Sequence, residues 1–216
     1  MAGIRKGLFT MPGCQRTVMQ RMLQSNKSFA DNNTGAESVL LQTLTQCTYT
    51  FPGFFEGNNA VKRRDIYTKP WTELTDVLYN EKRNGSLSHN LSLLKTAVYS
   101  VRNFWALDTW RVLRQMEEEW NTAKTNMHGD HLGMISSIDA LNTSMFAFLG
   151  MNRESVRREQ GWNIMDLGRK LEQTLYIITL LRSVFQTKHE EQVEHDLLES
   201  VMTRQPEFNY LPVYLS

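Results

Sequence analysis

The chain has 216 residues, which suits one domain with a sizeable core, or one domain and part of a second. Lysine and arginine number 24 and aspartate and glutamate 23, so the net charge is +1. A balance this close to zero gives no electrostatic argument for binding nucleic acid or a membrane surface. Two cysteines, Cys14 and Cys47, are too few for a disulfide scaffold and favour a cytoplasmic protein.

Neither a targeting signal nor a membrane span is expected from the sequence. Gly7, Thr10, Pro12 and Gly13 follow the basic start of the chain and interrupt the apolar stretch that a signal peptide needs. No stretch approaches the roughly 18 apolar residues of a transmembrane helix. We therefore expect neither a membrane nor a nucleic acid among the partners.

Glycine and proline are sparse, and between them the apolar residues follow helical spacing without the alternation of a strand. Asp108 is a candidate N-cap, and Gly150 a candidate helix end. The fold class expected is all-α, a multi-helix bundle of mostly antiparallel helices, because short connections favour antiparallel neighbours. In chain order the expected helices cover residues 17–29, 37–47, 86–105, 108–120, 132–150, 161–186 and 193–201.

Two of these helices carry long apolar stripes, which we expect to face the core. In the helix over 86–105 the stripe consists of Leu87, Leu91, Leu94, Val98, Val101 and Trp105. In the helix over 161–186 it consists of Ile164, Leu167, Leu171, Leu175, Ile178, Leu181 and Phe185. Trp105, Trp110 and Trp120 lie on or near such stripes, which favours core packing over ligand stacking.

Familiar catalytic and metal-binding motifs are missing from the sequence. It contains no glycine-rich phosphate loop, Cys-x-x-Cys, His-Glu-x-x-His or nucleophile elbow. His189 and His195 flank several glutamates, but their spacing of six favours a solvated charged face over a metal site. His128 and His131 are expected to lie in a loop. We expect no cofactor and no metal.

One charged segment, residues 150–172, is less easily explained as a solvated surface. Gly168 costs about 1 kcal/mol relative to alanine inside a helix, and it lies at the edge of the apolar stripe, where another helix could approach closely. Glu172 follows one turn later on the same edge, where Arg158, Arg102 or Arg111 could donate to it. The spacing favours a structural ion pair over a catalytic or ligand-binding carboxylate, and leaves both open.

The same segment resembles the signature of the bacterial alpha-E domain family. The upstream residues 85–87 and 99–113, and the turn 48–54, resemble two further motifs of that family in the same order. We therefore expect a single alpha-E-like helical domain over 1–216, with clear resemblance over 40–187, a divergent start at 1–35 and an irregular tail at 204–216. The matching signature residues are Glu154, Ser155, Arg158, Gly161, Trp162, Asp166, Gly168, Arg169, Leu171 and Glu172.

The chain also departs from the family pattern. Residues 8–17 stand where the family has a first copy of the glutamate motif, but lack its tryptophan and glutamate and contain Pro12, which disfavours a helix. Gln173 replaces the arginine after Glu172, and Arg157 replaces a threonine. The family continues with helices that repeat the earlier half. We therefore expect this chain to correspond to the central part of the family domain.

The resemblance implies that the chain functions together with partner proteins. Members of the family occur beside, or fused to, ATP-grasp-type ligases and transglutaminase-like proteins, with an expected part in peptide synthesis or modification. The chain would then be an accessory helical module, with a cluster of Glu172, Glu154, Arg158, Arg169 and Asp166 as its site. The first alternative is a non-catalytic scaffold that forms a homo-oligomer or pairs with the missing repeat half. The second is an enzyme that uses Glu172 and Glu154 as an acid–base pair, so enzymatic activity stays open.

Overall fold

The computed structural model describes residues 35–54, 70–125, 131–155 and 160–202, and every structural statement here concerns these residues. They form helices joined by turns, with no strand in the described part, so the predicted all-α class is confirmed. The elements are α2 (Gly35–Thr48), α4 (Pro70–Tyr79), α5 (Leu87–Ser100), the 3₁₀ helix η1 (Arg102–Phe104), α6 (Leu107–Thr125), α7 (His131–Ser155), α8 (Gln160–Phe185) and α9 (Glu191–Met202).

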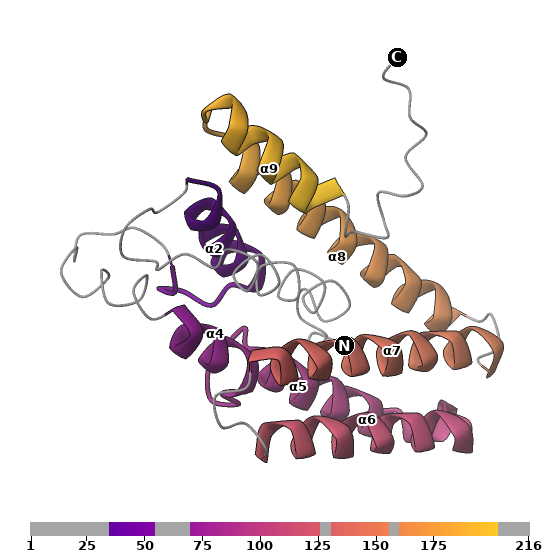
Figure 1. The fold of residues 1–216 in the computed structure, drawn as a ribbon. Coiled ribbons are helices and arrows are strands. Elements are labelled where there is room, and N and C mark those ends of the chain that lie inside the picture. The colour runs from indigo at the N-terminus through magenta and orange to yellow at the C-terminus, as the bar shows by residue number, and fades with distance from the viewer. Residues whose placement is uncertain (1–34, 55–69, 126–130, 156–159, 203–216) are drawn as a thin grey trace.

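The helices form two groups (Figure 1). In the first, α7 packs along α6, with α4 and α5 beside them. In the second, α8 leaves the end of α7, α9 folds back along α8, and α2 packs against both. The helices of α6–α7 and of α8–α9 run antiparallel, as short connections favour.

One continuous core of buried apolar side chains joins the two groups. At its centre in the first group, the ring of Tyr79 stacks on Trp120 with centroids 4.9 Å apart. The Tyr79 hydroxyl pairs with Ser137 at 2.9 Å, and the Trp120 indole N–H donates to Ser88 at 2.9 Å. Burial raises the pKa of Tyr79 to about 12, against a smaller opposing effect of the Ser137 hydrogen bond. Trp120 therefore packs in the core as expected.

Most of the expected helices are present, with corrected ends. The segment 86–105 divides into α5, for which Ser86 is the N-cap, and η1. Asp108 lies in the first turn of α6 and is not its N-cap. Gly150 does not end α7, which continues to Ser155, because nothing at that position breaks the hydrogen bonding of the helix.

Two expectations fall elsewhere. The ten-residue helix α4 was not predicted. The expected helix over 17–29 lies outside the described residues.

The helix α7 also bears on the expectation that no segment could cross a membrane. Its residues His131–Met151 are long and apolar enough to do so by length and composition. In the structure Ile135, Ile138 and Leu141 of this stretch are buried in the core, and a core helix passes the same test.

The largest difference from the sequence prediction concerns α8. Its side chains that face the core are Tyr176, Leu180 and Val184, on the helix that packs against α2. The stripe expected to be buried lies on the opposite side of the helix, and its members are 39% to 59% exposed. The prediction was wrong because α8 is apolar on two faces, and periodicity does not say which of them a neighbour covers. The exposed residues are Ile164, Leu167, Leu171, Leu175, Ile178, Leu181 and Phe185.

Candidate functional site

The first half of α8 carries a compact charged cluster. It lies on the side of the helix that faces the core further along, in the second half of α8. Arg169 donates to one carboxylate oxygen of Asp166 at 2.7 Å, and Lys170 binds the other oxygen at 2.9 Å. These spacings of three and four residues place all three side chains on adjacent turns. The sequence therefore builds the cluster locally, within one helix, without help from a second element.

The electrostatics of the cluster favour a permanent anion. The hydrogen bond from Arg169, and then the bond from Lys170, lower the pKa of Asp166 below its ordinary value of 3.8. Asp166 therefore remains ionised at neutral pH, which suits charge pairing and does not suit a general acid.

The structure places the five predicted site residues unequally. Glu172 is half-buried and follows Arg169 by three residues on the same face of α8, so the row Asp166–Arg169–Glu172 is brought together on one helix. Glu154 belongs to the last turn of α7, and its side chain lies outside the described part. Arg158 lies outside the described residues altogether. The expected acid–base pair of Glu172 and Glu154 therefore stays a prediction.

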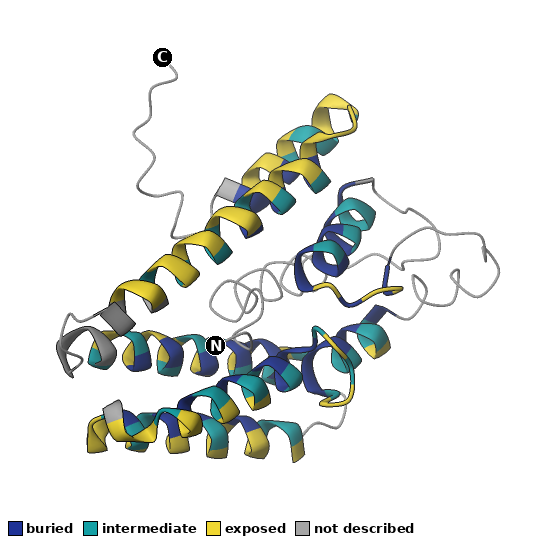
Figure 2. Ribbon diagram, turned by 180° about the vertical axis from the view of Figure 1, so that it is seen from behind, coloured by how far each residue is buried: buried dark blue, intermediate teal, exposed yellow. Residues whose placement is uncertain are grey.

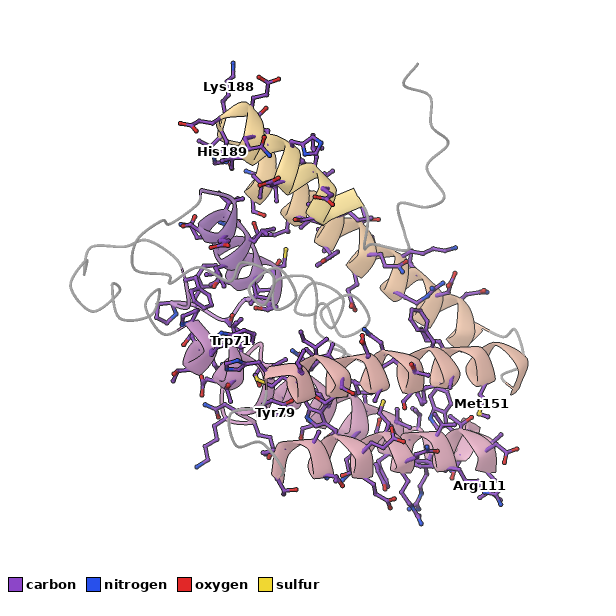
Figure 3. All side chains as sticks on the ribbon, in the orientation of Figure 1. Trp71, Tyr79, Arg111, Met151, Lys188 and His189 are labelled. Carbon is purple, nitrogen blue, oxygen red and sulfur yellow. The ribbon has the colours of Figure 1, made fainter. Side chains whose placement is uncertain are left out.

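Two details of the expected site are corrected by the structure. Gly168 does not lie against another helix, because a Cβ built at that position has no neighbour within 4 Å. Arg111 is exposed on α6 (Figure 3) and donates to Asp108 of the same helix at 3.2 Å. It therefore forms a local ion pair on α6, whereas it had been considered as a donor to Glu172 of α8. Arg102 is exposed in η1.

A second polar site, which the sequence analysis did not identify, lies where the turn after α2 meets the turn before α5. Arg83 donates to Asp76 at 2.6 Å, to Glu73 at 2.5 Å and to the carbonyl oxygen of Thr50 at 2.7 Å. Burial by itself would lower the pKa of Arg83, but the bonds to Glu73 and Asp76 outweigh it and raise the pKa.

Glycine shapes this second site. Gly85 has a φ of +85°, and a Cβ there would overlap the carbonyl oxygen of Thr48. The sequence signal for this contact was present, since both turns belong to the motifs that resemble the family. Three hydrogen bonds from Arg83 are made to the protein's own turns and helices, so the site is a structural junction.

The histidines form no metal site in the described part, where no group of three or more His, Cys, Asp or Glu side chains could hold a metal ion. His131 stacks on Trp71 with ring centroids 3.8 Å apart. His189 lies at the turn between α8 and α9 (Figure 3), where its backbone N–H donates to Glu194 at 3.1 Å. His195 is exposed on α9.

The α8 cluster is therefore the candidate functional site. A carboxylate fixed beside a guanidinium, with a second carboxylate one turn away, can bind an ammonium group through the acids or a carboxylate through Arg169.

Comparison with known proteins gives a family match. The model of the Alpha-E family, described as a predicted alpha-helical domain with a conserved ER motif, matches residues 15–205. The chain departs from that motif, because its sequence contains no Glu-Arg dipeptide and Glu172 is followed by Gln173.

The relatives found are bacterial and uncharacterised. The protein Rv2567 of Mycobacterium tuberculosis (strain ATCC 25618 / H37Rv) is 25% identical over 148 residues, which cover 67% of this chain and 17% of the relative. The protein Mb2597 of Mycobacterium bovis matches with the same identity and coverage. The matched region is thus a small part of these longer proteins. No solved structure matches the chain.

Proposed function

Since the chain belongs to the Alpha-E family, whose model matches residues 15–205, we propose that it is an accessory helical module that acts with an ATP-grasp-type ligase in peptide synthesis or modification. The proposal is carried by this family membership, because the resemblance implies such a ligase, and a transglutaminase-like protein, as partners. The matched region is only 17% of the mycobacterial relatives, which is in keeping with a module of a larger system. The ligase would hold ATP, and this chain would hold or present the peptide in the cytoplasm.

The α8 cluster supplies the chemistry for such a role. The ionised carboxylate of Asp166 and the guanidinium of Arg169 are suited to binding the charged ends of a peptide. Glu172, one turn further along, would contact the peptide amine or support Arg169. Glu154 and Arg158 are the other residues proposed for this site.

The test is a reconstituted ligase reaction. The chain and the ATP-grasp-type ligase of its host are purified, and peptide product and ADP are measured with and without the chain. We expect the chain to increase product formation, and Glu172→Gln to remove most of that increase. Glu118→Gln, a change at an exposed glutamate of α6, is the matched control and should have no effect. Product formation at the wild-type rate with Glu172→Gln would end the proposed role of this residue.

A second candidate function, a non-catalytic scaffold, is favoured by one specific observation. The face of α8 opposite the core carries a row of large apolar side chains that are exposed. Exposed residues follow one another along α8 in Figure 2. Monomeric proteins rarely leave such a contiguous patch uncovered, and patches of this kind mark interaction sites.

A further inference from the structure

The exposed face of α8 has the pattern of a helix that packs against another helix. Ile164, Leu171 and Ile178 recur every seven residues, and Phe185 continues the series. Leu167 and Leu181 lie three residues after members of this series, and Leu175 lies beside it. A repeat of seven with apolar residues at its first and fourth positions is the pattern of helices that pair along their length.

This face is separate from the contacts that hold α8 in the fold. Tyr176, Leu180 and Val184 are buried on the other side of the helix, which packs against α2. The exposed row runs along nearly the whole of α8, as the view from behind shows (Figure 2). A partner could therefore cover the row without disturbing the core.

The size and chemistry of the row suit a stable interface. Seven large apolar side chains that are about half exposed leave on the order of several hundred Å² of apolar surface, the size of a patch that marks an interaction site. A stable interface buries about 800 Å² on each partner. The polar side chains that border the row would supply the rest of this area. The row itself contains no carboxylate, and the charged residues that border it on α8 include Lys170, which is paired with Asp166, as well as Arg182 and Glu172.

We propose that this face of α8 binds the same face of a second copy of the chain, which forms a twofold symmetric dimer with paired α8 helices. A face that is apolar and repeats evenly along its length is complementary to itself, which is the requirement of a twofold interface. The pair of Asp166 and Arg169 lies on the other face of α8, so dimerisation through the row does not cover it. The dimer extends the proposed function and does not depend on it.

The first experiment measures the mass of the purified chain by sedimentation equilibrium over a range of concentrations, without any ligase. We expect a dimer for the wild type. Leu171→Glu should raise its dissociation constant at least about 30-fold, the effect of losing a central interface residue. Leu107→Glu, at an exposed residue of α6, is the matched control and should leave the dissociation constant unchanged. Since Leu171 is 56% exposed, the variant monomer should keep the circular dichroism of the wild type.

A second experiment keeps the proposal testable if Leu171→Glu fails to fold. Leu175 lies at the midpoint of the row, so a twofold axis through the centre brings its two copies together. In a Cys14→Ser background, Leu175→Cys should be cross-linked to a covalent dimer by a short bis-maleimide, and Leu107→Cys should not. Buried Cys47 should not react.

The outcomes separate the possible occupants of this face. A wild type that stays monomeric at all concentrations overturns the proposal. If amide exchange on α8 then slows only when residues 17–29 are present, that segment of the same chain is the occupant instead. A dimer that Leu171→Glu does not weaken also overturns the proposal, because another surface would hold it. None of these results changes the ligase assay, so the two proposals can fail separately.

Discussion

Asp166 accepts bonds from Arg169 at 2.7 Å and from Lys170 at 2.9 Å, and both residues are its near neighbours in sequence. Sequence reasoning could identify this group, since spacings of three and four on a helix specify the contact directly. The proposed part of Glu154 and Arg158 stays a prediction, because a contact between two different elements does not follow from spacing along one helix. At the residue scale, local pairs are predictable and pairs between elements are not.

The first prediction concerns the acid titration of Asp166. Its pKa in the folded chain is lowered, so the ion pair stabilises the fold at neutral pH and this contribution is lost as the pH falls through the lowered pKa. Replacing Arg169 with glutamine removes the main cause, and the pKa of Asp166 should rise toward 3.8. Carbon NMR of the side-chain carboxyl measures this titration. Arg111→Gln, which removes a partner of Asp108 only, should leave it unchanged.

At the scale of one helix, α8 shows why apolar periodicity predicted the wrong buried face. The patterns of α6 and α9 each offer one apolar face, and Leu113 of α6 and Leu197 of α9 are buried. The helix α8 offers two such faces. Which of them is covered is decided by α2, whose Thr43 pairs with Ser183 at 3.1 Å from far away in the sequence. The local pattern of apolar residues in α8 therefore could not predict which face this long-range packing covers.

The second prediction compares the two faces of α8. Leu180 is 4% exposed and Leu175 is 55% exposed on the same helix. Leu180→Ala should lower the free energy of unfolding by about 2–4 kcal/mol, because it leaves a cavity in the core where α8 packs against α2. Leu175→Ala should change it by no more than about 0.5 kcal/mol. Urea unfolding at low protein concentration, where any dimer has dissociated, measures both. Equal losses would contradict the orientation of α8.

The third prediction concerns the glycine that the sequence analysis took for a helix end. Gly150 lies inside α7, and a Cβ there would meet nothing within 4 Å. Gly150→Ala should therefore raise the free energy of unfolding by about 0.5–1 kcal/mol, by restricting the unfolded chain. Thermal unfolding followed by circular dichroism gives the change. The contrasting variant is Gly85→Ala, which should destabilise the protein because its Cβ would overlap Thr48.

At the scale of the whole molecule, the all-α class and most helices followed from the sequence, but the grouping of the helices did not. The short α4 could have been found from Pro70 at its first position and from the spacing of Leu74, Val77 and Leu78. No local signal placed α2 with α8 and α9, because the contacts join opposite ends of the chain. The junction at Arg83 then connects the turn after α2 to the first group of helices.

The last prediction tests whether the two groups unfold together. Arg83 links Thr50, in the turn after α2, to Glu73 and Asp76 of α4. Arg83→Met should lower the free energy of unfolding by about 2 kcal/mol, less than the 3–5 kcal/mol of a fully buried pair because the Asp76 side chain is 41% exposed.

Two optical probes follow the two groups in this variant. In a Trp162→Phe background, the remaining tryptophans at positions 71, 105, 110 and 120 report only on α4–α6 and the turn between α5 and α6, whereas circular dichroism reports on all helices. Since one core cluster contains residues of both groups, the two unfolding midpoints should coincide in the parent and fall together with Arg83→Met. A circular dichroism transition that separates from the fluorescence transition would mean that α2, α8 and α9 form an independently unfolding unit, held to the rest mainly by the junction at Arg83.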